Sequence, residues 1–271
     1  MNIPVDPILT AHSALRSPLA IRGPLSGPIE EVQLVNVVKR GVFGFNSRDR
    51  RSRPFNLLRA QVIKLMKAQG WKRLGITSAT PAVGKTFIAS NLSASLSRVP
   101  EQRTLLFDLD LRRGSVATQY DLTDQPGMET YLSGDIDTLA PVARAVAGSN
   151  LVVYPSFPLV NKSSAELLAG ARMRALIDAM GDLPEDCMAI CDLPPAFAND
   201  DASIVLEQID AFLLVVEEGK TTARQVRDAL KVLAPAPCIG TVLNRYNGVI
   251  GGDDYGFGYW SQGKYDAYYN N

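Results

Sequence analysis

A loop in the first half of the sequence has the residues needed to bind phosphate. It reads Ser78-Ala79-Thr80-Pro81-Ala82-Val83-Gly84-Lys85-Thr86 and lies between an apolar segment and one with helical spacing. In such a loop, successive backbone N–H groups and the positive end of the following helix attract anions. We expect Lys85 to reach the β- and γ-phosphates of a nucleotide and Thr86 to ligate Mg²⁺. Ala79 replaces the first glycine of G-x-x-x-x-G-K-[ST], and a chance match is the alternative.

Three aspartates stand where apolar segments end. Asp108 and Asp110 close TLLFDLD, where strand alternation turns both side chains the same way. Asp192 ends CMAIC, and the two prolines that follow Leu193 stop further strand pairing. Crowded carboxylates repel one another unless a cation lies between them, and Mg²⁺ prefers oxygen ligands. These residues therefore predict a Mg²⁺ site with a catalytic base, although a helix-capping role for Asp108 or Asp110 is the alternative.

Two arginines, Arg112 and Arg113, directly follow the aspartate segment. They could neutralise a transferring phosphate or contact the carboxylates of a neighbouring subunit. Solvated loop arginines are the alternative.

Other kinds of catalytic site find little support in the composition. The single histidine, His12, lies in a Pro-rich segment, which argues against a Ser/His/Asp triad or a histidine-ligated metal. Three cysteines without CxxC spacing are interpreted as core thiols. Lys and Arg together number 28, as do Asp and Glu, so no global field favours nucleic acid or a membrane surface.

The spacing of apolar residues indicates which elements position these side chains. Short β-rich segments alternate with helical patterns, and this predicts an α/β fold with a doubly wound, mostly parallel sheet flanked by helices. The expected strands cover residues 73–78, 104–110, 150–156, 187–193, 211–217 and 238–244. The expected helices cover 85–98, 165–180 and 222–233, with a further helix around 57–66. Ser163 and Glu166 fit a capping box at the start of the helix expected over 165–180.

The 271 residues divide into three parts by composition. Residues 1–52 are Pro- and Gly-rich with a basic end, and they predict a loosely ordered, flexible leader. Residues 53–247 form the nucleotide-binding domain, and 248–271 are a Tyr-rich segment, interpreted as a mobile tail. No apolar run approaches the length of a membrane span, and the first ten residues lack a secretory pattern, so a cytoplasmic protein is expected.

The motifs together resemble a known family. ITSATPAVGKT, TLLFDLDLRRG and MAICDLPP are similar to the Walker A, Walker A′ and Walker B motifs of the bacterial tyrosine kinases (BY-kinases) of capsular and exopolysaccharide synthesis. That family belongs to the ParA/MinD-like P-loop class. YLSGD, NLVVYPS, SSAELL and GTVLNR follow in the family's order, so the resemblance covers about residues 53–247, and the tail extends it.

The resemblance implies an ATP-dependent protein-tyrosine autokinase that regulates polysaccharide polymerisation and export. Lys85 and either Asp108 or Asp110 would be catalytic, the aspartate accepting the tyrosine proton. Mg²⁺ would be held by Thr86 and the other two of Asp108, Asp110 and Asp192. The nucleotide would contact Pro81, Ala82, Val83, Gly84, Lys85, Thr86 and Phe87, with Asn244 at the adenine. The phosphorylated residues, modified by a neighbouring protomer, would be Tyr255, Tyr259, Tyr265, Tyr268 and Tyr269.

The resemblance also implies partners. The chain is similar to the split form of the family, in which a membrane-anchored co-polymerase or chain-length regulator activates the kinase at the inner face of the plasma membrane. A homo-oligomer and a tyrosine phosphatase are implied as well, and nucleic acid is not. The family pattern is altered at Ala82, at Gly114 and in the interface motif E-x-x-R-x-x-R, which reads Arg53-Pro54-Phe55-Asn56-Leu57-Leu58-Arg59 here.

Two other functions remain as alternatives. One is a ParA/MinD-type ATPase switch, against which Thr80 counts, because that class carries a lysine five positions before the P-loop lysine. The other is a catalytically weak nucleotide-binding scaffold whose tyrosines act as stacking groups.

Overall fold

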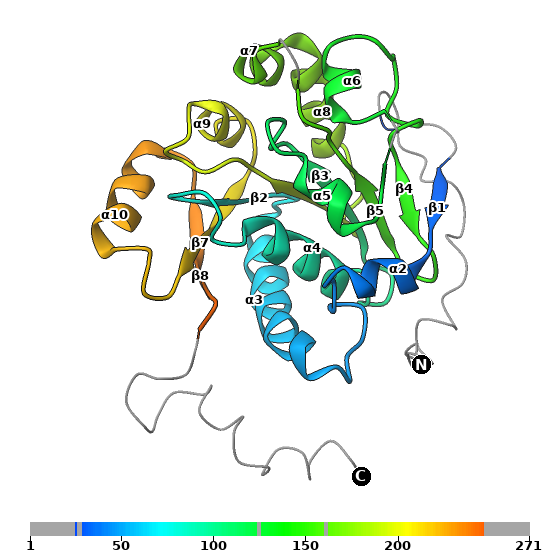
Figure 1. Ribbon diagram of the computed structural model, residues 1–271, viewed down its shortest axis with the longest axis horizontal. Helices are drawn as coiled ribbons and strands as arrows, with labels where there is room; N and C mark the ends of the chain where they lie inside the picture. Colours follow the sequence, from blue (N-terminus) through cyan, green and yellow to red (C-terminus); the bar gives the residue numbers. More distant parts are fainter. Residues whose placement is uncertain (1–24, 26–28, 124–125, 160–161, 247–271) are drawn as a thin grey trace.

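A mostly parallel eight-stranded sheet forms the centre of the computed structural model, which describes residues 25, 29–123, 126–159 and 162–246. Its strand order is β1-β4-β5-β3-β6-β2-β7-β8, and only the β4–β5 pair is antiparallel (Figure 1). The strands are β1 (Glu30–Val32), β2 (Arg73–Ser78), β3 (Arg103–Asp108), β4 (Arg144–Val146), β5 (Leu151–Tyr154), β6 (Cys187–Asp192), β7 (Ala211–Glu217) and β8 (Cys238–Asn244). The expected doubly wound α/β fold is confirmed.

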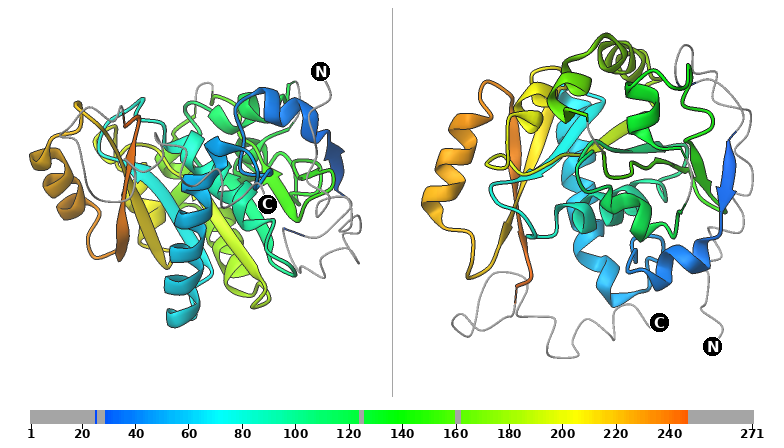
Figure 2. Two further views of the ribbon diagram at one scale, coloured as in Figure 1. Left: turned by 90° about the horizontal axis from the view of Figure 1, so that it is seen from below. Right: turned by 45° about the horizontal axis from the view of Figure 1, so that its top comes forward.

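Helices cover both faces of this sheet (Figures 1 and 2). One face packs against α3 (Arg53–Gln69), α4 (Lys85–Leu96) and α5 (Ser115–Gln119). The other face packs against α6 (Met128–Leu132), α7 (Ser164–Ala169), α8 (Ala171–Gly181), α9 (Asp201–Leu206) and α10 (Ala223–Val232). Because both faces are covered, the central strands β2, β3 and β6 are buried over almost their whole length.

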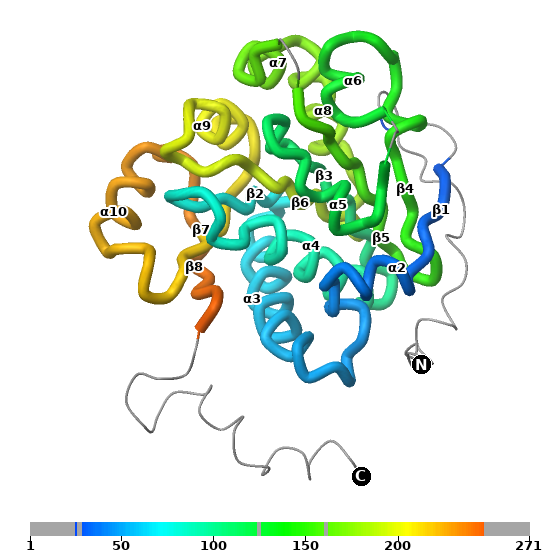
Figure 3. Tube along the Cα trace, viewed as in Figure 1, coloured from blue at the N-terminus to red at the C-terminus, as the bar shows by residue number. Residues whose placement is uncertain are grey.

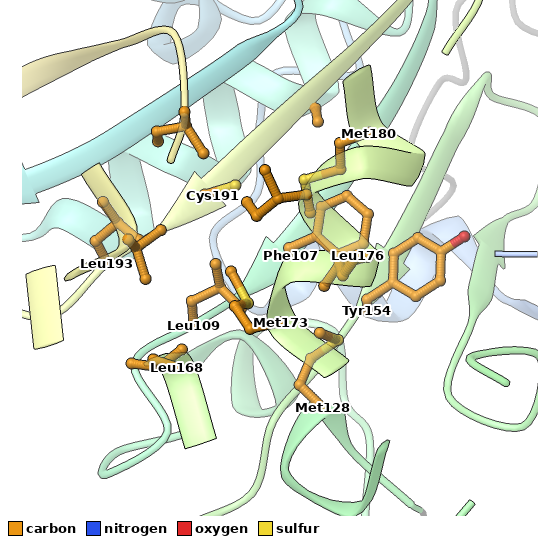
Figure 4. Close-up of a cluster of buried hydrophobic side chains, with 14 of the residues drawn as sticks. Phe107, Leu109, Met128, Tyr154, Leu168, Met173, Leu176, Met180, Cys191 and Leu193 are labelled. Atoms are coloured by element: carbon orange, nitrogen blue, oxygen red, sulfur yellow. The ribbon is translucent and has the colours of Figure 1, made fainter. Parts of the chain in front are cut away.

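The packing around β3 shows how the second face is filled (Figure 4). The ring of Phe107 stacks on that of Tyr154 from β5, with centroids 4.5 Å apart and planes 7° apart. Leu176 and Met180 of α8 are buried in the same cluster. These contacts fix β3, whose last residue is Asp108, within the sheet.

Helix boundaries follow local signals, with one difference from expectation. Ser163 accepts a hydrogen bond from the backbone N–H of Glu166, which agrees with the predicted helix start. The single helix expected over 165–180 is instead two helices, α7 and α8, because Gly170 adopts an extended conformation between them.

Part of the expected leader, residues 30–52, is folded in the structure. Residues 30–52 contain β1, α2 (Leu34–Lys39) and the 3₁₀ turn η2 (Arg50–Ser52), and β1 extends the sheet by parallel pairing with β4. This segment, blue in Figure 3, continues directly into α3. Three of its apolar residues, Val37, Val42 and Phe45, are buried in the core beside α4. Such short elements leave no periodic signal in a Pro- and Gly-rich stretch. The expected tail, 248–271, lies outside the described residues.

Candidate active site

Strand order brings the predicted motifs to one edge of the sheet. β6 lies between β3 and β2, with Asp108 paired in register with Asp192 and Asp192 with Ile76. All three strands are parallel, so their carboxyl ends meet. The loop from β2 to α4 and the three aspartates therefore share this edge.

The loop before Lys85 is held by its neighbours. The backbone N–H groups of Ala196 and Phe197 donate to the carbonyls of Ser78 and Ala79, at 2.7 and 3.2 Å. Two residues of the loop have left-handed backbones, Ala82 with φ 63° and Gly84 with φ 92°. These two turns let the chain reverse and start α4 at Lys85.

Lys85 and Asp110 form a buried ion pair. The Nζ of Lys85 donates to Oδ2 of Asp110 at 2.6 Å, and the two residues are only 6% and 2% exposed. Burial, the largest effect on Lys85, favours the neutral amine. The negative charges of Asp192, Asp110 and Asp108 outweigh it, and the pKa of Lys85 is raised. Lys85 is therefore charged and placed among the carboxylates that the sequence singled out.

Asp108 is bound by backbone amides. Its Oδ1 accepts from the N–H of Asp110 at 3.2 Å, and its Oδ2 accepts from the N–H of Val116 at 3.0 Å. Val116 lies in the first turn of α5, so the helix-capping alternative applies to this residue. Burial and the charge of Asp192 raise the pKa of Asp108 well above its usual range.

Asp192 is the aspartate left without partners. It is fully buried, and among the described residues neither of its carboxylate oxygens accepts a hydrogen bond. Burial raises its pKa to about 6, while the charge of Lys85 and the nearby Thr86 hydroxyl oppose that rise. An unpartnered buried carboxylate beside a threonine hydroxyl fits a hard, oxygen-seeking cation such as Mg²⁺. Within the described ranges, however, no three His, Cys, Asp or Glu side chains are arranged as a ready metal cluster.

Two of the predicted nucleotide contacts, Asn244 and Phe87, contact other parts of the protein in the structure. Asn244, at the end of β8, donates from Nδ2 to the carbonyl of Val83 at 2.8 Å. A Cβ on Gly84 would lie 2.2 Å from that nitrogen, so Asn244 lies directly against the loop. The ring of Phe87 packs edge-to-face against Phe43 and Phe55. The Phe87 side chain thus belongs to the contact between α4 and the N-terminal segment.

Two polar residues at this edge were missed by sequence reasoning. Ser164 and Asp201 are buried, and both contact the guanidinium of Arg112. Asp201 lies nine residues after Asp192, but nothing in its spacing indicates an arginine as its partner. The five tail tyrosines lie outside the described residues.

Comparisons with known proteins match about two thirds to three quarters of the chain. No family model matches the sequence. The tyrosine-protein kinase Etk of Escherichia coli (strain K12) is 33% identical over 175 residues, 63% of this chain and 23% of Etk, so the match spans about a quarter of that relative. The tyrosine-protein kinase YwqD of Bacillus subtilis (strain 168) is 32% identical over 204 residues, 73% of this chain and 81% of YwqD.

Solved structures show the same relationship. The kinase domain of the Escherichia coli tyrosine kinase ETK superposes with a TM-score of 0.66 and 31% identity, covering 74% of this chain and 78% of that one. A ParA family ATPase from Chlorobium tepidum TLS, with a TM-score of 0.50 and 19% identity over 65% of this chain and 75% of that one, shares the fold. With YwqD matched over most of its length and the phosphate-binding loop, Lys85 and the aspartates at one sheet edge, this chain belongs to the family of bacterial tyrosine-protein kinases.

Proposed function

We propose that this chain is an ATP- and Mg²⁺-dependent protein-tyrosine autokinase that regulates the polymerisation and export of a capsular or exopolysaccharide. One observation carries the proposal: the buried Lys85–Asp110 ion pair lies beside the unpartnered carboxylate of Asp192, at the mouth of a phosphate-binding loop. The relatives named tyrosine-protein kinases supply the class of reaction.

The loop and the start of α4 would bind the nucleotide. Backbone N–H groups of residues 81–87 would cradle the phosphates, and Asn244 would approach the adenine from β8. Lys85 would exchange its contact with Asp110 for a phosphate oxygen, because two charged partners compete for one ammonium group. Nucleotide binding would thus release Asp110.

The released Asp110 is the better candidate for the base, since Asp108 is engaged by two backbone amides. In the transfer, the bond from the γ-phosphorus to the bridging oxygen breaks and a bond to the tyrosine Oη forms, while the phenolic proton passes to Asp110. A Mg²⁺ held by Thr86 and Asp192, with Asp108 adjacent, would neutralise the phosphate charge. The protein contributes positioning and electrostatics to this reaction.

The acceptors would be the tail tyrosines of a neighbouring protomer in a homo-oligomer. Each phosphotyrosine adds about −1.5 to −2 charge, so a phosphorylated tail would be repelled by the carboxylates of the site and loosen the assembly. A tyrosine phosphatase would reset it. A membrane-anchored co-polymerase would activate the kinase and hold it at the inner face of the plasma membrane. Among the described residues, no helix has both the length and the apolar character of a membrane span.

Incubation with ATP·Mg²⁺, with and without the activator, followed by mass spectrometry of tyrosine phosphorylation, tests this function. We expect phosphate on the tail, and its loss in Lys85→Met. Lys64→Met, at an exposed position of α3, is the matched control and should keep the activity. ATP hydrolysis without phosphotyrosine would indicate a ParA-type switch, and neither activity would indicate a scaffold.

A further inference from the structure

A second polar cluster lies two residues beyond Asp110, on the same loop. The Nε of Arg112 donates to Oγ of Ser164 at 3.0 Å and to Oδ2 of Asp201 at 3.3 Å. The Ser164 hydroxyl itself donates to the same Asp201 oxygen at 2.7 Å. Ser164 begins α7 and Asp201 begins α9, so three separate parts of the chain meet here.

The cluster is buried on one side and open on the other. Asp201 is 1% exposed, whereas 58% of the Arg112 side chain is accessible to solvent. Only the Nε of the guanidinium is engaged; its two terminal nitrogens donate to no acceptor within the described ranges. Asp201 in turn keeps its Oδ1 unpartnered among the same residues. Burial of the Asp201 carboxylate is destabilising, and its contact with Arg112 fixes the orientation of an arginine at the surface. This arrangement indicates a functional role for Arg112.

The loop that carries Arg112 is fixed on its other side as well. The N–H of Leu159 donates to the carbonyl of Leu111 at 3.0 Å. Gly114, with φ 59°, lies so close to Ser156 that an added Cβ would be 2.4 Å from its carbonyl oxygen. Asp110 and Arg112 are thus held in a fixed relation, and two residues span at most about 7 Å. A tyrosine at Asp110 would bring its chain neighbours within reach of Arg112.

We propose that Arg112, oriented by Ser164 and Asp201, binds the carboxylate of an acidic residue next to the acceptor tyrosine and so determines substrate specificity. The inference rests on the proposed kinase function. A guanidinium presents two parallel N–H groups that match a carboxylate, and here that edge is the one left open. Ser164 and Asp201 are positioning residues, since they act through Arg112.

The tail sequence contains both kinds of acceptor. Asp254 directly precedes Tyr255 and Asp266 directly follows Tyr265, whereas Tyr259 has Gly258 and Trp260 as neighbours. Tyr268 and Tyr269 also lack an adjacent acidic residue. The proposal therefore predicts that Tyr255 and Tyr265 are phosphorylated before the other three.

A time course of site-resolved phosphorylation on the full chain, with ATP·Mg²⁺ and the activator, tests this order. We expect initial rates at Tyr255 and Tyr265 about tenfold above that at Tyr259, a ratio typical of one charge-assisted contact. Arg112→Gln should bring both down to the rate of Tyr259. Asp254→Asn should slow Tyr255 alone and leave Tyr265 fast. Lys162→Gln is the matched control, because Lys162 is an exposed cation two residues before Ser164 and has no part in the proposed site.

The positioning role needs its own measurement. With a synthetic peptide that carries Asp before Tyr, Ser164→Ala should raise KM about threefold to tenfold and leave kcat near its original value. Asp201→Asn should also raise KM and leave kcat unchanged. Nucleotide binding checks that each variant is folded. If Asp201→Asn does not fold, the result for Ser164→Ala tests the positioning role by itself. A fall in kcat with KM constant would overturn the positioning role.

The possible results distinguish a failure of the specificity role of Arg112 from a failure of the proposed kinase function. Absence of phosphotyrosine in the wild type with its activator would reject the kinase function itself. Phosphorylation at equal rates on all five tyrosines would reject only the specificity role. An equal effect of Lys162→Gln would also reject it, because a general positive field would then explain the preference.

Discussion

At the scale of single residues, Ala82 is the unusual member of the phosphate-binding loop. Its φ of 63° is a left-handed conformation in which the Cβ approaches the following carbonyl oxygen. Gly84, two residues on, adopts φ 92° without that cost. The alanine is exposed, so no packing contact offsets the strain. The loop therefore keeps its shape because the surrounding hydrogen bonds hold it.

The strain at Ala82 predicts that Ala82→Gly raises the free energy of unfolding by about 1 kcal/mol. Urea denaturation measures the change. Ala60→Gly is the matched control, since Ala60 is exposed within α3, where glycine costs about 1 kcal/mol. Ala82→Gly should therefore raise the free energy of unfolding, and Ala60→Gly should lower it. A lower free energy of unfolding in both variants would show that Ala82 is not strained.

At the scale of elements, α4 couples the nucleotide loop to the N-terminal segment. Asn91, in the middle of α4, accepts from the backbone N–H of Phe43 at 2.6 Å and from that of Gly44 at 3.1 Å. Its Nδ2 donates to the carbonyl of Gly41 at 3.2 Å. Lys85 begins the same helix. The segment before α3 thus contacts the helix that begins at Lys85, the proposed catalytic lysine.

The close approach at Gly44 predicts that Gly44→Ala destabilises the protein by about 2 kcal/mol, because the new Cβ would lie 2.2 Å from the carbonyl oxygen of Asn91. Hydrogen exchange should accelerate over residues 40–55 in particular. Gly181→Ala, at the end of α8, meets only the tip of Arg73 at 3.6 Å and should cost nothing. Equal stability of the two variants would show that the loop can move away from α4.

At the scale of the whole molecule, the folded unit begins before residue 52. β1 adds an outer strand through parallel pairing with β4, and the core includes Val37, Val42 and Phe45. These side chains cover part of the same apolar cluster as α3 and α4. The segment is therefore part of the domain that positions the site.

Removal of residues 1–52 should lower the free energy of unfolding by about 5 kcal/mol, since each of the three buried side chains contributes about 1.5–3 kcal/mol. Thermal denaturation measures the loss. A chain that begins at residue 29 retains these contacts and serves as the control. Equal melting temperatures for the two truncated proteins would contradict the assignment of 29–52 to the domain.

Most of the fold follows from local patterns in the sequence. The alternation of apolar strands with helical segments predicts the parallel sheet, and β2, β6 and β7 end within one residue of their expected positions. The antiparallel β4, of three residues, and the break at Gly170 leave no comparable signal, because a short element is defined by its neighbours more than by its own periodicity.

The sequence by itself predicted a phosphate-binding loop before Lys85 and placed Asp108, Asp110 and Asp192 at or just after the ends of two strands, at one edge of the sheet. Only the tertiary structure decided how these residues divide their roles: Asp110 pairs with Lys85, Asp108 binds the first turn of α5, and Asp192 is left without a partner. It also decided that Asp201 meets Arg112, 89 positions away. Residue types and spacing define what a side chain can do, whereas its partners depend on strand order and helix packing, which join segments far apart in the chain.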